Sequence, residues 1–230
     1  MERMQFPTWG EHRPSAMATP GEPTSKKNAI LTNTASVTQD FEPMRNIGAH
    51  LHAFHAYADD TKRYVEANHY CGHLSNDVRQ CLIYDSTGRD ARLIGIEYMI
   101  APHLYESLPQ DERRLWHSHV YEVKSGMLVM PNRTVPATVW DAAERKEMAE
   151  IITLYGKTYH LWQTDRGDKL PLGEPKLMTS LTADGQLDAI TMKQRDEKFG
   201  ISCKDKKASR ADIRSPKIHP DADSAWSRKR

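Results

Sequence analysis

Three successive segments between residues 63 and 100 show the period-two pattern of β-strands and are separated by short polar sequences. They are RYVEANHYCGHL, QCLIYDS and ARLIGIEYMI, and the connections SNDVR and STGRD contain the Asn, Asp, Ser and Gly that turns favour. Apolar runs of this length with such short connections are typical of neighbouring antiparallel strands. This feature restricts the chain to folds built around an antiparallel sheet.

The other patterned segments add helices and further strands. Apolar residues at helical spacing, or an acidic-to-basic charge order, predict helices over residues 40–60, 108–116, 138–156 and 187–200. Further strands are predicted over residues 117–131 and 157–165. Gly156 and Gly200 are expected to cap the helices that they follow. The predicted fold class is α+β, a single domain with a mostly antiparallel sheet flanked by helices.

The two ends differ in composition from the centre. Residues 1–36 are rich in Pro, Ser, Thr and Gly without hydrophobic periodicity, which predicts a flexible N-terminal extension. Residues 37–202 form the predicted globular domain, and residues 203–230 a basic, irregular C-terminal tail. From Lys204 to Arg230 there are nine Lys and Arg against four Asp. We expect a mobile tail, with docking on an anionic membrane surface as the alternative.

Composition excludes several classes of function. The 32 basic and 31 acidic residues nearly cancel, which argues against nucleic acid as a partner. No apolar window is long enough for a transmembrane span, and the first residues lack a signal peptide. Three cysteines without a C-x-x-C pair predict no disulfide framework and a reducing, cytoplasmic location. Phosphate-binding glycine motifs and the serine-hydrolase elbow are absent, so no nucleotide cofactor is expected.

Histidines are concentrated on two of the predicted strands. In an extended chain His69 and His73 share one face, as do His117 and His119. Imidazole is the commonest biological metal ligand, so these four residues are candidate ligands for a divalent metal. Nitrogen and oxygen ligands with at most one thiolate favour zinc, iron or manganese.

Glu97 is a carboxylate within an apolar strand, which is costly unless it meets a metal or a cation. We predict that it is a further ligand or a catalytic acid or base. Cys71 is expected to be an inert core residue, and His52 and His55 to be packed or capping histidines. Two alternatives remain: a hydrogen-bonded histidine network without an ion, and a cupin-like motif formed by H-x-H with Glu122.

Five runs, HYCGHLSNDVRQCLIYDS, ARLIGIEYMI, LWHSHVYEVKSGMLVMP, YGKTYHLWQTDRGDKLPLG and PKLMTSLTADGQ, resemble the oil-body-associated protein family. The resemblance extends from Ile47 to Trp226 and implies association with seed oil bodies, as for some plant members. It brings no established reaction. The N-terminal extension and the terminal SRKR depart from the family pattern.

Two functions from different classes are therefore expected. The first is an oil-body-associated-protein-like soluble protein that carries the histidine-rich metal site and lies peripherally on lipid droplets. The second is a metal-dependent enzyme that acts on a small, apolar, lipid-derived molecule through the histidines and Glu97. The first predicts that charges introduced into the helix expected from Thr38 to Ala58 weaken droplet binding. The second predicts about one copurifying metal per chain.

Overall fold

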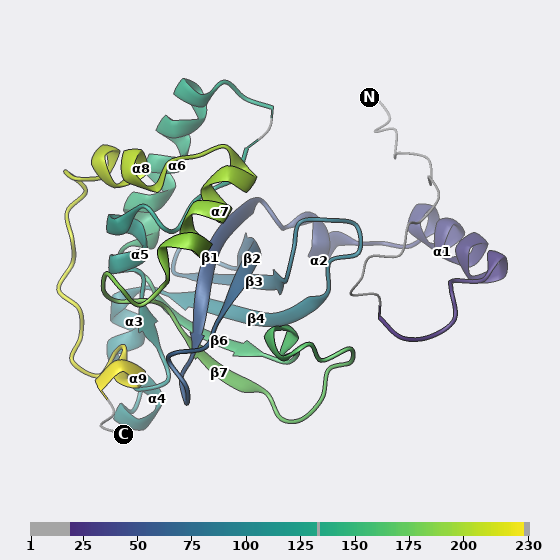
Figure 1. Cartoon of the computed structure of the whole chain (residues 1–230), viewed down its shortest axis with the longest axis horizontal. Coiled ribbons are helices and arrows are strands. Elements are labelled where there is room, and N and C mark those ends of the chain that lie inside the picture. Colours follow the sequence, from purple (N-terminus) through teal and green to yellow (C-terminus); the bar gives the residue numbers. More distant parts are fainter. Residues whose placement is uncertain (1–18, 133, 228–230) are drawn as a thin grey trace.

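The computed structural model describes residues 19–132 and 134–227. In this part of the chain the strands are β1 (Ala49–Tyr57), β2 (Tyr64–His73), β3 (Val78–Tyr84), β4 (Leu93–Ile100), β5 (His117–Ser118), β6 (Tyr155–His160) and β7 (Lys176–Thr179). They form one antiparallel sheet in the order β4-β3-β2-β1-β7-β6-β5. Because β4 also pairs with β6, six of the strands close into a barrel (Figure 1).

The helices lie outside this barrel. They are α1 (Lys26–Thr38), α2 (Glu42–Arg45), α3 (Pro102–Glu106), α4 (Gln110–Arg113), α5 (Val120–Ser125), α6 (Ala137–Ile151), α7 (Ala189–Phe199), α8 (Cys203–Ser209) and α9 (Ser224–Ser227), with a 3-10 turn, η1, at Thr164–Arg166. Most of them gather on one side of the sheet, whereas α1 stands apart from the barrel (Figure 1). The predicted α+β fold class is confirmed.

Alternate residues of each strand point into the barrel. Their side chains form three layers. One apolar layer contains Leu51, Cys71 and Met99, which pack against residues of α6 at one end of the barrel. A second apolar layer contains Tyr57 and Ile83, together with other residues of the opposite end. Histidines and a glutamate occupy the level between them, so apolar side chains separate this polar level from solvent.

The helix predicted over residues 40–60 is wrong, because its second half forms strand β1. From Leu51 to Tyr57 every residue of β1 is buried. The inner face of β1 lines the barrel, and its outer face, which includes Phe54, packs against residues such as Leu181 and Met192. A strand buried on both faces has no polar alternation, so its apolar residues can also fit a helical period.

The strand predicted over residues 117–131 is also wrong over most of its length. Only His117 and Ser118 pair with β6, beside Gly156 and Tyr155. Strand β7 pairs with β6 only from Thr158 onward. Strand β5 pairs with the residues of β6 that precede this point. The chain then turns into α5, so Glu122 lies on a helix and the cupin-like motif is not present.

Several other element predictions are confirmed. Strands β2, β3, β4 and β6 and helices α4, α6 and α7 overlap the predicted segments. Asp188 caps the start of α7 through its side chain, and Gly200, with a φ of 63°, ends it. Helix α6 ends before Gly156, which lies in β6 and not at a helix cap. None of the described helices is long and apolar enough to cross a membrane.

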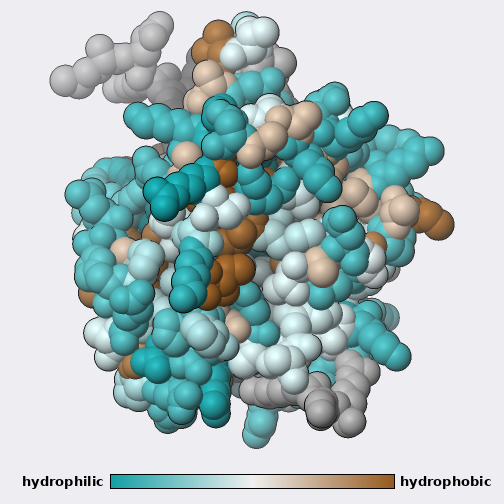
Figure 2. All heavy atoms as spheres, turned by 90° about the vertical axis from the view of Figure 1, so that its left-hand side faces the viewer, coloured by the Kyte–Doolittle hydropathy of each residue, from teal (hydrophilic) through white to brown (hydrophobic). Residues whose placement is uncertain are grey.

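Residues 203–227, expected to form a mobile and irregular tail, lack regular structure over residues 214–219 but begin with helix α8. In this segment Arg210 and Ile213 are buried. The Arg210 guanidinium donates to the carbonyls of Val123 and Leu128, at 3.2 and 2.7 Å, and pairs with Glu144 at 3.1 Å. These partners hold the charge of Arg210 inside the fold. Figure 2 shows the side of the molecule on which most helices gather, a largely hydrophilic surface with a small recessed apolar area.

The cysteine prediction is contradicted as well. Cys71 and Cys81 lie opposite each other on β2 and β3 and form a disulfide. Cys203 is the free cysteine of the described residues. The odd number of cysteines therefore conceals one bonded pair, and the cysteines no longer support a reducing compartment.

Candidate metal centre

Five imidazoles and two carboxyl groups are buried in or beside the middle level of the barrel, each no more than 3% exposed. They come from β1, β2, β4, β5, β6 and the start of α5: His55, His69, Glu97, His117, His119, Glu122 and His160. Inward-facing positions on separate strands bring them together, although they lie far apart in sequence. A concentration of ionisable groups in an apolar interior is expensive and marks a functional site.

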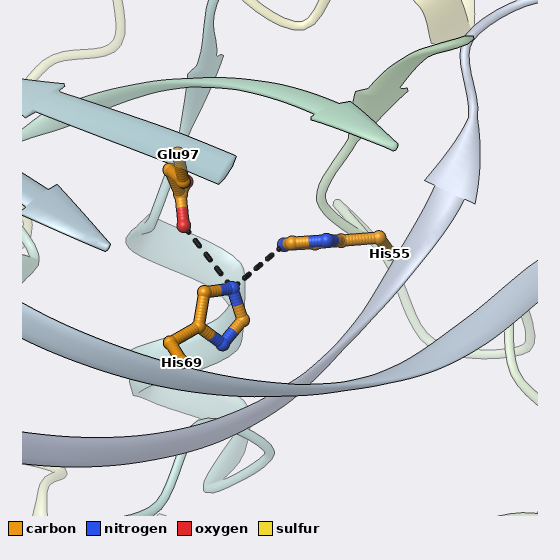
Figure 3. A group of neighbouring side chains, drawn as sticks. All are labelled: His55, His69 and Glu97. Carbon is orange, nitrogen blue, oxygen red and sulfur yellow. Dashed lines mark hydrogen bonds and ion pairs between the residues drawn. The ribbon is translucent and has the colours of Figure 1, made fainter. Parts of the chain in front are cut away.

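The first set of ligands consists of His55, His69 and Glu97 (Figure 3). The Nε2 atom of His69 lies 3.1 Å from Nε2 of His55 and 3.1 Å from Oε2 of Glu97. A ring nitrogen carries either one proton or one lone pair, so His69 Nε2 cannot donate one hydrogen bond and accept another. The three atoms converge more as ligands do around a cation than as partners in a hydrogen-bond chain.

The second set consists of Glu97, His117 and His119. Oε1 of Glu97 lies 3.0 Å from Nε2 of His117 and 3.5 Å from Nε2 of His119. Despite the short distance, Glu97 Oε1 and His117 Nε2 are not aligned for a hydrogen bond, and neither atom has a hydrogen-bond partner among the described residues. Buried polar atoms are rarely left without a partner, so these two atoms indicate a ligand that the protein atoms do not supply.

Outer contacts fix the orientation of two imidazoles. His119 donates from Nδ1 to the carbonyl of Leu154 at 2.9 Å, which holds the ring with Nε2 toward Glu97. Nδ1 of His55 lies 3.1 Å from Nε2 of His160, so His160 can fix the tautomer of His55. Metal-binding histidines usually have such a partner on the second ring nitrogen.

The charges of the cluster are shifted by burial and by one another. Burial alone would raise the pKa of Glu97, but its contacts with His117, His119 and His69 hold it well below its ordinary value. Burial lowers the pKa of His55 well below 6.5, and that of His160 to about 3. For His119 burial acts in the same direction, but Glu97 outweighs it and raises the pKa to about 9. In the metal-free centre Glu97 is therefore a carboxylate, His55 and His160 are neutral imidazoles, and His119 is an imidazolium.

Glu122 is the second carboxyl group at this site. Burial raises the pKa of Glu122 to about 8, and its Oε1 has no hydrogen-bond partner among the described residues. With His55, His69, Glu97 and His119 it lines a cavity of about 10 Å³. That volume suits about one water molecule or one ion.

Gly156 leaves space for the second set. A Cβ atom at this position of β6 would lie 2.3 Å from Oε1 of Glu97 and 2.6 Å from Nε2 of His117. Any other residue would push the carboxylate and the imidazole apart. The missing side chain is therefore part of the site.

The spacing of the ligand atoms fits a metal ion. Bonds of roughly 2.0–2.1 Å in a tetrahedral shell place neighbouring ligand atoms about 3.3 Å apart. The distances of 3.1 Å between His69 and Glu97, and of 3.0 and 3.5 Å from Glu97 to His117 and His119, lie around this value. Each set contains two histidines and one carboxylate, a combination that zinc, iron and manganese accept.

Among the sequence-predicted residues, His69, Glu97, His117 and His119 come together, but His73 does not. His73 lies at the end of β2, opposite Arg79, and is exposed. Strand parity places it on the correct face, but at the last residue of β2, away from the middle level of the barrel. His52 is buried outside the cluster, where its Nε2 lies 3.0 Å from Glu66, so its expected packed role fits its position.

His55 and His160 were not predicted as site residues, and Glu122 entered only through the cupin-like alternative. His55 was assigned to a helix, and His160 was not singled out within its predicted strand. Both residues have the inward parity that identified His69. The helix assignment hid it for His55, whereas for His160 it could have been read from the correctly predicted strand. Glu122 lies on a helix beside the barrel, and nothing in its local sequence indicates that it is buried.

The fold and the site define a class: an antiparallel β-barrel protein with a buried histidine–glutamate centre that could bind a metal ion. A family model described as "Protein of unknown function (DUF1264)" matches residues 41–214. The chain belongs to this family.

Three relatives have the names that the family resemblance predicts. The chain is 44% identical over 208 residues to oil body-associated protein 1B of Arabidopsis thaliana. The matched residues make up 90% of this chain and 84% of the relative. It is 46% identical over 203 residues to oil body-associated protein 1A of Zea mays, with coverages of 87% and 83%. Oil body-associated protein 2A of Zea mays is 39% identical over 216 residues, with coverages of 93% and 83%. No solved structure gives a significant match.

Proposed function

We propose that this protein binds a divalent transition metal inside its barrel, through Glu97 and the histidines around it. The observation that carries the proposal is the convergence of two buried sets, each with two imidazoles and a carboxylate, on oxygens of Glu97. Zinc, iron and manganese are the candidate metals. Glu97 is a ligand in this proposal, and His73 has no part in the site.

The alternative, a hydrogen-bonded network without an ion, accounts for fewer of the contacts. It leaves Glu97 Oε1 and His117 Nε2 without aligned partners, and it gives His69 Nε2 two neighbours where one bond can form. A buried polar group without a partner costs roughly 1–3 kcal/mol. A cation between these atoms would satisfy all of them.

Elemental analysis of untagged protein tests metal binding. We expect bound zinc, iron or manganese in the purified protein, and loss of that metal in the Glu97→Gln variant with retained secondary structure. His73→Asn is the matched control, because it removes an exposed imidazole from the same strand as His69. Equal metal content in wild type and Glu97→Gln, or none in wild type after incubation with each ion, would contradict the proposal.

A metal-dependent enzyme is the second candidate, and Glu122 is the observation that favours it. A carboxyl group with a raised pKa beside a metal site can act as a general acid or base. The adjoining cavity has room for about one water molecule, so a lipid-derived substrate would require movement of residues such as Leu128. Catalysis also requires a coordination position that exchanges with solvent.

Water proton relaxation of the Mn²⁺-loaded protein separates an enzyme from a sealed structural site. An enzyme should show enhanced relaxation, because solvent reaches the ion. A sealed metal should leave relaxation close to that of buffer. The second result would exclude the enzyme while metal binding still holds.

Peripheral attachment to lipid droplets in the cytoplasm is proposed from the names of the relatives and from one surface feature. The arm formed by α1 and α2 carries large exposed apolar side chains: Ile30, Leu31, Val37, Phe41 and Met44. Helix α1 stands apart from the barrel, whereas α2 lies against it (Figure 1). The second half of the segment first expected to form a droplet-binding helix is strand β1, so the exposed apolar side chains of this arm are the better candidate for the contact.

Flotation with triacylglycerol droplets coated by phospholipid tests this attachment. The combined Ile30→Glu and Val37→Glu variant should lose most droplet binding, because charges at these positions oppose insertion into the lipid layer. Leu170→Glu with Leu172→Glu is the control, since it adds the same charge at two exposed apolar positions outside the arm. Equal flotation of both variants and wild type would contradict a contact through the arm.

A further inference from the structure

The buried cluster divides into two sets of ligands that share one carboxylate. His55 and His69 form the first set with Glu97, and His117 and His119 form the second. Glu97 directs a different oxygen to each set, with Oε2 3.1 Å from His69 and Oε1 3.0 Å from His117. In the described part of the chain the two sets have only Glu97 in common.

One ion cannot use both histidine pairs. With bonds of roughly 2.1 Å, two ligands on opposite sides of one ion are at most about 4.2 Å apart. Within each set the ligand atoms lie within 4.8 Å of one another, but in the described chain the two pairs do not combine into one set even at that wider spacing. A single ion would therefore leave one pair of buried imidazoles without a metal ion to bind.

We propose that the centre holds two divalent transition metal ions bridged by Glu97, one on His55 and His69 and the other on His117 and His119. The inference rests on the proposed metal binding and adds a second ion to it. In two-metal sites the ions lie roughly 3.5–4 Å apart, a separation that the two oxygens of one carboxylate can bridge.

The surroundings provide for the added charge. Two divalent ions against the one carboxylate of Glu97 would leave a large positive charge in an apolar interior, which is costly. Glu122 lines the same cavity as His55, His69 and His119 and has a free carboxyl oxygen among the described contacts. An ionised Glu122 carboxylate can therefore reduce the net charge of the metal pair.

Metal stoichiometry of wild-type protein is the first test. Metal-free protein is reloaded separately with Zn²⁺ and Mn²⁺, freed of excess ion and measured by elemental analysis and calorimetric titration. We expect two ions per chain. One ion per chain would overturn the two-ion inference and leave the proposed metal binding intact, whereas no bound ion would overturn both.

Pair variants assign each ion to its ligands. The double variants His55→Asn with His69→Asn, and His117→Asn with His119→Asn, should each retain one ion. His73→Asn, the exposed control, should retain two. Circular dichroism confirms that each variant is folded, and a folded pair variant that still binds two ions would overturn the assignment of that pair.

Electron paramagnetic resonance of wild type provides a readout that needs no variant. Two Mn²⁺ ions bridged by Glu97 should couple, so full loading should replace the hyperfine pattern of isolated Mn²⁺ with a broadened, temperature-dependent spectrum. An isolated-ion spectrum at full loading would overturn the bridged pair.

Discussion

Replacement of Glu122 with glutamine tests how much a buried acid beside the barrel costs in stability. Burial raises the pKa of Glu122 from 4.5 to about 8. In metal-free protein at pH 7 the carboxyl group is therefore protonated in the folded state and ionised in the unfolded chain. Between these two pKa values the folded state binds one more proton, so the free energy of unfolding falls as the pH rises.

The magnitude follows from the same two pKa values. The stability that the protonated acid contributes is complete below pH 4.5 and is lost as the pH rises through 8. Each pH unit in this window costs about 1.4 kcal/mol, so the loss is about 1 kcal/mol at pH 5 and about 3 kcal/mol at pH 7. Glutamine does not titrate. Glu122→Gln should therefore gain about 2 kcal/mol on wild type between pH 5 and pH 7.

Urea unfolding in the presence of a chelator measures this gain. Because only the change with pH is compared, any constant effect of a buried amide cancels. Glu174→Gln is the control, since Glu174 is exposed and its variant should follow the wild-type curve. If the stabilities of Glu122→Gln and wild type change in parallel from pH 5 to pH 8, the carboxyl group is not protonated in the folded protein and the reasoning fails.

Three further predictions concern the bound metal, Gly156 and the C-terminal segment. A chelator should lower the melting temperature of loaded protein, and reloading should restore it, because free ion at 1,000 times its Kd adds about 4 kcal/mol; an unchanged melting curve contradicts bound metal. Gly156→Ala should cost about 1–3 kcal/mol and release the metal of His117, as seen by elemental analysis, whereas Gly88→Ala meets nothing within 4 Å and should retain it. Arg210→Met should cost about 3 kcal/mol in urea unfolding, since it leaves Glu144 buried without this partner, and exposed Arg214→Met should cost little; equal losses would contradict a stabilising role of the Arg210 contacts.

The sequence predicted strands best where one face of the strand differs from the other. In β2 and β3 the inward residues are apolar or histidine apart from Arg79, and the outward residues are mostly polar or half-buried, so period-two alternation was visible. Strand β1 lacks this contrast because α7 and its neighbours cover the outer face. Its assignment to a helix hid His55, which belongs to the same parity argument as His69.

The same limit applies to the C-terminal segment. Nine basic residues in a polar segment predict a solvated tail, yet Arg210 is 1% exposed and bonded to carbonyls of α5 and the following loop. Its partners are more than 60 residues away in sequence, and local composition carries no information about them. The Cys71–Cys81 disulfide depends in a similar way on the register of β2 and β3.

By itself, the sequence determined the α+β class and the antiparallel core, and it identified His69, Glu97, His117 and His119 as candidates, because residue type and period are local properties. Only the tertiary structure decided which histidines meet. Closure of β4 onto β6 turns the inner faces of all strands toward one axis. That closure brings His55 and His160 to Glu97 and leaves His73 at the exposed end of β2, since distances across a barrel depend on register and strand order.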